Sequence, residues 1–208
     1  MRPERLSVRQ SGGSRFKAES GAWLTIPNLL TLFRLVLIAP FGWLCIRGHN
    51  IPALFVFLIA GITDTLDGTL ARRFNQRSKF GRLADPIADK LLTTVSFLAL
   101  SLFRQGRPAI PLWVTIAVIG RDALILIGSF VVYVSTGSTA FQPGAFGKVN
   151  TFIELGTIVL VLVSARLAFL AHVLSPVYFM LILSLILSTT AYVLQGLRTM
   201  RMARAGST

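Results

Sequence analysis

The sequence predicts an all-α membrane protein with six transmembrane helices, a polar cavity that faces the cytoplasm, and a basic N-terminal arm. Hydrophobic residues make up 53% of the 208 residues and charged residues only 14%, against about 25% charged in soluble proteins. Long apolar runs follow one another along the chain, and basic residues gather at alternate ends of these runs. Both observations are typical of a chain that crosses a bilayer several times.

The predicted helices follow from the apolar segments. The second and third segments look short because their facing ends carry charged residues, and we expect those helices to continue through residues 71 and 81 into the aqueous boundary. No internal repeat divides the chain, so we predict one catalytic domain over residues 23–208 after a basic arm over residues 1–22. The six segments lie roughly at 29–46, 51–66, 86–103, 110–134, 149–171 and 175–196.

The orientation follows from the positions of lysine and arginine, which favour cytoplasmic loops. With a cytoplasmic N-terminus, 14 basic residues fall inside and only 4 outside. We therefore expect an integral multi-pass protein of the bacterial inner membrane or an equivalent membrane, with both termini in the cytoplasm. The four outside residues are Arg47, Arg104, Arg107 and Arg166.

The formal net charge of +13 indicates an anionic partner. In a chain with long apolar runs, anionic lipid head groups explain that charge better than nucleic acid does, so we expect a membrane partner and no nucleic acid. The arm at residues 1–22 either lies on anionic lipid or simply sets the topology. Cys45 is the only cysteine, so an intramolecular disulfide is excluded.

The acidic residues are concentrated in one short stretch. Asp64, Asp67, Asp85 and Asp89 lie within 26 residues and make up half of the eight carboxylates in the chain. Carboxylates this close together repel one another unless cations or protons neutralise them. Two helices that face each other across residues 72–80 would form a cage of four carboxylates, which are hard oxygen ligands suited to two Mg²⁺ or Mn²⁺ ions.

Small residues accompany the acids on the same helix faces. Gly68, Ala71 and Gly81 lie near the aspartates at helical spacing, so a ligand can approach the backbone there. Arg72 adds a fixed cation whose fork matches a phosphate group. Acidic ligands beside small residues and arginine indicate a metal-bound pyrophosphate, as in phosphoryl-type transfer.

These eight residues resemble the signature of the CDP-alcohol phosphatidyltransferase family, D-x2-D-G-x2-A-R-x8-G-x3-D-x3-D, at every position. The resemblance extends to Ile26-Pro27-Asn28 through Arg34 and to the run at residues 85–90. It implies an enzyme that transfers the phosphatidyl group of CDP-diacylglycerol to an alcohol and releases CMP. It also implies that Asp64, Asp67, Asp85 and Asp89 bind the metals, that Asp89 is the general base, and that Gly68, Ala71, Arg72 and Gly81 line the nucleotide site.

The resemblance further implies an acceptor site built from two cations. Similar enzymes use an arginine and a lysine at the places of Arg121 and Lys148 to bind the acceptor phosphate. Asn28 and Arg34 either reach the nucleotide or pair with the acidic cluster. Residues 28–34 and 85–90 resemble members that use glycerol 3-phosphate, which is narrowly the first choice of acceptor because it is the commoner activity of bacterial type. Residues 120–122 and 148–151 instead resemble members that use phosphatidylglycerol.

Each of these residues also has a simpler interpretation. Asp85, which precedes a proline, suits a helix N-cap, and Gly68 and Gly81 suit close helix packing. Lys90 is expected to extend to the lipid head groups. Arg121 in an apolar segment also suits a structural ion pair with Asp122 or Glu154. The remaining basic residues of the acidic stretch set topology, namely Arg73, Arg77, Lys79 and Arg82.

Two other functions compete with the enzyme. A cation transporter would also need carboxylates, but its site is expected near the bilayer midplane in repeated halves. A lipid-binding scaffold would not need all four aspartates. The oligomeric state is not predicted beyond the homodimer that is common in similar enzymes.

Overall fold

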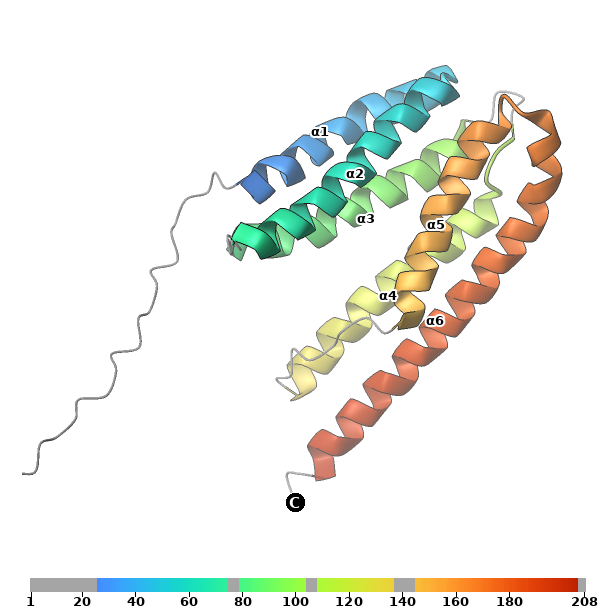
Figure 1. The fold of residues 1–208 in the computed structure, drawn as a ribbon. Coiled ribbons are helices and arrows are strands. Elements are labelled where there is room, and N and C mark those ends of the chain that lie inside the picture. The colour runs from blue at the N-terminus through green and yellow to red at the C-terminus, as the bar shows by residue number, and fades with distance from the viewer. Residues whose placement is uncertain (1–25, 75–78, 104–107, 137–144, 206–208) are drawn as a thin grey trace, which may run out of the picture.

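Six α-helices make up most of the described chain, which agrees with the predicted number (Figure 1). The computed structural model describes residues 26–74, 79–103, 108–136 and 145–205, and side chains within 29–64, 88, 90–103, 108–132, 134 and 146–201. The predicted arm at residues 1–22 lies outside these ranges. The helices are α1 Ile26–Arg47, α2 Asn50–Phe74, α3 Lys79–Leu102, α4 Leu112–Thr136, α5 Ala145–Ser164 and α6 Ala171–Ala205, with a 3₁₀ turn at Ala168–Leu170 before α6.

The helices form two groups of three. In Figure 1, α1, α2 and α3 lie on one side, and α4, α5 and α6 on the other. Helix α1 packs against both α2 and α3, and α6 packs against both α4 and α5. The groups meet where α5 contacts α2 and α3 and where α3 contacts α4. A ligand held between α3 and α4 would therefore bridge the two groups.

The observed helix ends agree with the prediction in the acidic stretch, but the end of α5 differs from it. Helix α2 continues to Phe74 and α3 begins at Lys79, so both helices extend past residues 71 and 81 as expected. The prediction of one helix over 149–171 is wrong, because α5 ends at Ser164. The Ser164 hydroxyl donates to the Val161 carbonyl at 2.8 Å, and a turn follows in which the Arg166 amide donates to the Val163 carbonyl at 3.0 Å.

The turn between α1 and α2 depends on one glycine. Gly48 has a φ of 74°, a left-handed conformation that side-chain-bearing residues rarely adopt. Its amide donates to the Cys45 carbonyl at 3.0 Å, and the next amide, of His49, donates to the Leu44 carbonyl at 2.8 Å. These bonds satisfy carbonyls at the end of α1. The chain can therefore reverse within two residues and begin α2 at Asn50.

Four helices of the described chain are long and apolar enough to cross a membrane. The expectation of six such helices is met only in part: within the described residues, α2 and α3 contribute the shorter apolar helices Asn50–Asp64 and Lys90–Leu102. The motif's charged residues occupy the remaining turns of both helices. Large apolar side chains face outward, including Phe130 at 67% and Phe152 at 78% exposure, as expected for contact with lipid. The protein is an integral multi-pass membrane protein.

The core lies where the helix groups meet. Phe41 of α1 and Phe57 of α2 are both buried, and their ring centroids lie 5.8 Å apart. Phe97 of α3 and Ile158 of α5 have no exposed surface. Because these side chains come from both groups, burial of apolar surface fixes the two groups against each other at the end of the bundle away from the acidic stretch.

Labelling of introduced cysteines tests the topology. Cys45 is 3% exposed, so the unmodified chain should react little with a membrane-impermeant maleimide. We expect His49→Cys, in the turn between α1 and α2, to be labelled in intact cells. Arg201→Cys, near the end of α6, should be labelled only after permeabilisation. Labelling of both positions from the same side would contradict the predicted orientation.

Candidate functional site

The acidic motif lies on two helices joined by a short connection. Asp64 and Asp67 belong to α2, and Asp85 and Asp89 belong to α3, with only residues 75–78 between the helices. Asp64 lies ten residues before the end of α2, and Asp89 lies ten residues after the start of α3. At about 1.5 Å per residue, these two positions are about 15 Å from the ends that the short connection joins. The backbone thus carries all four aspartates toward one end of the helix pair.

Arg34 of α1 holds the first aspartate of the motif. Its guanidinium Nη1 lies 2.6 Å from Asp64 Oδ1, and the arginine side chain is 1% exposed. The Asp64 side chain is 48% exposed, so a ligand arriving from outside can reach its carboxylate. Of the two interpretations of Arg34 from sequence, pairing with the acidic cluster is the one that this geometry supports.

The other motif side chains lie outside the described ones. Within the described part, no group of three or more acidic, histidine or cysteine residues could hold a metal ion. That search does not reach three of the four predicted ligands. The predicted residues whose side chains lie outside are Asp67, Asp85 and Asp89 of the metal site, and Asn28, Gly68, Ala71, Arg72 and Gly81 of the nucleotide site.

A second set of charged residues is buried between α3, α4 and α6. Asp122 of α4 accepts from two cations: its Oδ2 lies 2.8 Å from Lys90 Nζ of α3, and its Oδ1 lies 2.9 Å from Arg121 Nη1. The same arginine donates through Nη2 to the Ser188 hydroxyl of α6 at 2.5 Å. The expectation that Lys90 extends to the head groups is therefore wrong, because a closer carboxylate binds it.

Helix α5 adds a second acidic residue to this set. Glu154 is fully buried and interacts electrostatically with Lys90, Arg121 and Asp122. Its Oε1 accepts from Asn150 Nδ2 at 2.6 Å, and Asn150 Oδ1 accepts from the Ser184 hydroxyl of α6 at 3.0 Å. We call the set the polar layer: Lys90, Arg121, Asp122, Asn150, Glu154, Ser184 and Ser188. Its two cations both pair with the carboxylate of Asp122, as charged residues in an apolar interior require.

The predicted acceptor cations are placed differently from each other. Arg121 is nine-tenths buried within the polar layer. Lys148 is exposed near the start of α5, outside the polar layer. The sequence analysis did not single out Asn150, Ser184 or Ser188. The spacing of polar residues in the sequence could have indicated them. Asn150 and Glu154, like Ser184 and Ser188, are four apart in apolar segments and so share one helix face.

Beside Arg121, a mainly apolar groove runs between α4 and α6. Its volume is about 360 Å³, and its walls include Ala117, Gly120 and Leu124 of α4 and Ile182, Leu185 and Ile186 of α6. Arg121 also lines it. The groove is open at its edge, where Leu124 and Ile186 are 46% and 58% exposed. It thus places a cation at the wall of a lipid-facing hollow.

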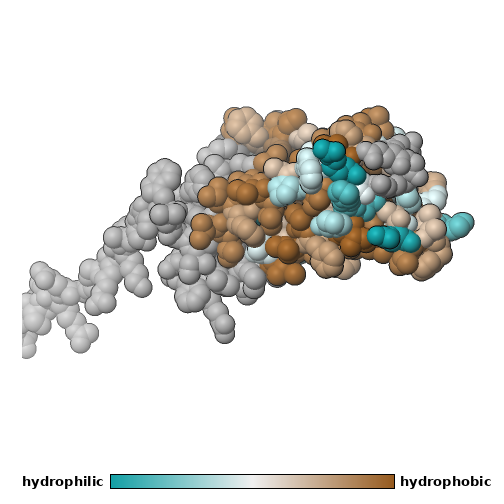
Figure 2. Space-filling view, turned by 90° about the horizontal axis from the view of Figure 1, so that it is seen from above, coloured by the Kyte–Doolittle hydropathy of each residue, from teal (hydrophilic) through white to brown (hydrophobic). Residues whose placement is uncertain are grey.

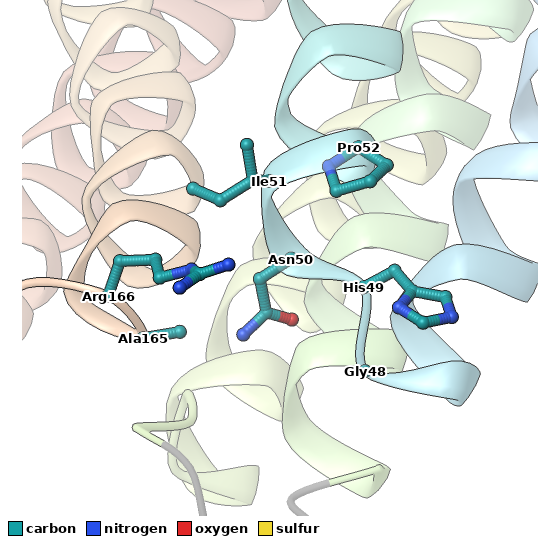
Figure 3. Close-up of a pocket in the computed structure, with 7 residues that line it drawn as sticks. All are labelled: Gly48, His49, Asn50, Ile51, Pro52, Ala165 and Arg166. Atoms are coloured by element: carbon teal, nitrogen blue, oxygen red, sulfur yellow. The ribbon is translucent and has the colours of Figure 1, made fainter.

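A polar cavity of about 470 Å³ lies at the opposite end of α2 from the motif, and it is not the cytoplasmic cavity that the sequence predicts. Its lining includes Gly48, Asn50 and Arg166, and Asn50 is about 21 Å along α2 from Asp64. In Figure 3 the Arg166 side chain extends toward the start of α2, while His49 points away. Figure 2, which looks onto this end of the bundle, shows hydrophilic residues gathered among apolar ones.

Comparison with known proteins gives one family and two kinds of relative. The sequence model of the CDP-alcohol phosphatidyltransferases matches residues 24–195. The chain is 38% identical over 151 residues to a probable cardiolipin synthase (CMP-forming) of Drosophila melanogaster, covering 65% of this chain and 46% of that protein. It is 40% identical over 110 residues to a cardiolipin synthase (CMP-forming) of Streptomyces coelicolor, covering 50% and 49%. The chain thus spans about half the length of these two relatives.

A third relative matches over almost its whole length. The CDP-diacylglycerol–glycerol-3-phosphate 3-phosphatidyltransferase of Aquifex aeolicus is 30% identical over 180 residues, which cover 84% of this chain and 97% of that protein. The names of these relatives differ: two state cardiolipin as the product, and the third states glycerol 3-phosphate as a substrate.

A double-mutant cycle tests the ion pair that joins α3 to α4. We expect Lys90→Met and Asp122→Asn each to lower the thermal unfolding temperature of the purified protein, because each removes one side of the ion pair between α3 and α4. The double variant should lose less stability than the sum of the two single losses, with a coupling free energy of about 0.5–3 kcal/mol. Additive losses would show that the two side chains do not stabilise each other.

Proposed function

Because the chain belongs to the CDP-alcohol phosphatidyltransferase family, we propose that it transfers the phosphatidyl group of CDP-diacylglycerol to a hydroxyl acceptor and releases CMP at the cytoplasmic face. The observation that carries this proposal is the eight-residue motif on α2 and α3, within the part of the chain that the family covers. A cation transporter is less well supported, since no internal repeat divides the chain as expected for such a site, and the matching family model is that of a transferase.

The chemistry of the motif suits a pair of divalent metal ions. Asp64, Asp67, Asp85 and Asp89 supply hard oxygen ligands, and the described one, Asp64, is half-exposed and so open to a ligand. Two Mg²⁺ or Mn²⁺ ions bound there would offset four negative charges and withdraw charge from the pyrophosphate. Arg34, buried against Asp64, fixes the direction of that carboxylate.

The proposed reaction is a displacement at phosphorus. Asp89 accepts the proton of the acceptor hydroxyl, and the hydroxyl oxygen forms a bond to the lipid-side phosphorus of CDP-diacylglycerol. The bond from that phosphorus to the bridging oxygen breaks, and CMP leaves with the bonding electrons. Gly68, Ala71 and Gly81 leave room for the cytidine diphosphate, Arg72 binds its phosphates, and Asn28 reaches the nucleotide from α1. The role of Asn28 follows from the resemblance of residues 26–34 to the family, and each of the other roles follows from the position of the residue in the motif.

For the acceptor we propose phosphatidylglycerol, which would make the product cardiolipin. Two observations support this choice over the glycerol 3-phosphate that comes narrowly first from sequence alone. The Drosophila and Streptomyces relatives, which are named as cardiolipin synthases, are 38% and 40% identical over 151 and 110 residues, against 30% over 180 residues for the Aquifex relative. In addition, Arg121 lines a lipid-facing groove, as a phosphate-binding residue for a membrane lipid would. Lys148, exposed at the start of α5, would meet the acceptor head group from the water side.

Glycerol 3-phosphate is the second candidate, on a specific observation. The Aquifex relative, which is named for this acceptor, matches the chain over 97% of its own length. A small water-soluble acceptor would use Arg121 and Lys148 without the groove.

An acceptor panel tests the proposed activity. Purified protein in vesicles with CDP-diacylglycerol and Mg²⁺ or Mn²⁺ should release CMP when phosphatidylglycerol is added. Glycerol 3-phosphate, inositol phosphate and serine, offered separately, should give much less. A chelator should abolish release and excess metal restore it. CMP release that ignores the chelator would contradict the metal site, and release with glycerol 3-phosphate alone would establish the second candidate.

Removing the proposed base should separate binding from turnover. Asp89→Asn keeps the size of the side chain but cannot accept the hydroxyl proton, so we expect turnover to fall by about 10²–10⁴-fold. Nucleotide binding, measured by calorimetry with CDP-diacylglycerol in detergent, should fall much less. Asp64→Asn serves as the comparison, because it should weaken binding as well. Equal losses of binding and turnover in Asp89→Asn would make Asp89 a metal ligand only.

A further inference from the structure

The groove between α4 and α6 has the shape of a site for one hydrocarbon chain. Its α4 wall runs from Ala117 through Gly120 to Leu124, seven residues or about 10 Å along the helix axis. Gly120 leaves room at this wall: a Cβ built there meets no other atom within 4 Å. The volume of about 360 Å³ falls within the range of roughly 300–1,000 Å³ that is usual for ligand sites.

The walls offer an entering ligand few polar groups. Leu185 is buried at the α6 wall, and Ile182 and Ile186 extend the apolar surface. Thr189 and Thr190 also line the groove, and the Thr190 hydroxyl donates to the Ile186 carbonyl at 2.8 Å. That bond satisfies the hydroxyl within its own helix. The groove therefore suits an acyl chain and not a sugar or a nucleotide.

Arg121 adds a cation that can donate one further hydrogen bond. Its guanidinium is nine-tenths buried and donates to Asp122 and Ser188, but its Nε–H has no hydrogen-bond acceptor among the described residues. A buried charged donor without an acceptor is costly unless a ligand completes it. A phosphate oxygen is a suitable acceptor for such a group.

We propose that this groove holds an acyl chain of the phospholipid acceptor, whose phosphate binds Arg121. The proposal rests on the proposed function, and it names the feature that would select a lipid acceptor over a water-soluble one. The donor's pyrophosphate belongs to the motif on α2 and α3, in the other group of helices, so the groove is placed for the acceptor. The bilayer is as apolar as the groove, so the groove contributes position: it sets the depth at which the phosphate meets Arg121.

A graded series at Gly120 tests the proposal. Gly120→Ala, Gly120→Val and Gly120→Leu fill the groove progressively, and the open space there means that none should disturb packing. In vesicles with saturating CDP-diacylglycerol, the KM for dioleoyl-phosphatidylglycerol should rise with side-chain size, reaching about tenfold for leucine. The KM for CDP-diacylglycerol should not change. Dihexanoyl-phosphatidylglycerol, whose chains are too short to depend on the groove, should be affected much less.

The matched control is Gly156→Leu. Gly156 is an exposed glycine of α5 with the same open surroundings, and it lies outside the groove. This variant should keep the wild-type KM for both lipids. Together with thermal unfolding of each variant, it separates groove filling from a general effect of a bulky side chain.

Two results would contradict the proposed role of the groove while leaving the proposed function intact. Equal effects of Gly120→Leu on the long-chain and short-chain acceptors would show that the groove holds no acyl chain of the acceptor. A rise in the KM for CDP-diacylglycerol alone would assign the groove to the donor. A different result would contradict the proposal that phosphatidylglycerol is the acceptor. In that case the wild-type protein would release CMP with glycerol 3-phosphate but not with phosphatidylglycerol.

Discussion

The arrangement of the helices depends on the pairing of charges inside an apolar bundle. Asp122 is nearly buried and binds Lys90 of α3 and Arg121 of its own helix through its two oxygens. An ionised side chain without a partner would destabilise such an interior by several kcal/mol. The carboxylate therefore fixes how closely α3 approaches α4. Ser188 extends the same constraint to α6 by accepting from Arg121.

This constraint also connects the two places where substrates are proposed to bind. Lys90 directly follows Asp89, the proposed base, and Asp122 directly follows Arg121, the proposed acceptor cation. The 2.8 Å contact between Lys90 and Asp122 thus ties the backbone at the base to the backbone at the acceptor site. General base catalysis requires the hydroxyl within hydrogen-bond reach of the base. A buried ion pair one residue from each group holds that distance more firmly than a flexible loop would.

Much of this arrangement was predictable, because it depends on local pattern. Apolar segments and the Lys and Arg distribution predict six helices, and the motif predicts that α2 and α3 continue into their charged turns. The partner of Lys90 was not predictable in this way. Lys90 lies near the start of an apolar segment, where a lysine side chain could reach water. Its partner carboxylate instead comes from Asp122, which only the packing of α3 against α4 brings near.

The end of α5 shows a second limit of local pattern. Residues 165–171 are mostly apolar, so hydropathy continues the helix, whereas the chain turns after Ser164 to begin α6. The choice depends on where α6 must start in order to pack against both α4 and α5. Asn150, Ser184 and Ser188 were missed for a related reason. Small polar residues are common in membrane helices, and their hydrogen bonds become visible only when the facing helices are placed.

The charge balance of the polar layer bears on how an anionic acceptor enters it. Lys90 and Arg121 both pair with Asp122, so both cations already have a counter-ion before a substrate arrives. A phosphate that binds Arg121 must compete with Asp122 for the guanidinium, so its binding free energy is a difference between two ion pairs. Lys90 lowers the cost of that exchange, because it stays on the second oxygen of Asp122 and keeps the carboxylate paired. A single arginine with a single carboxylate would hold the phosphate only by leaving a buried charge alone. The presence of two cations on one aspartate is thus what allows a structural ion pair to serve also as a binding site.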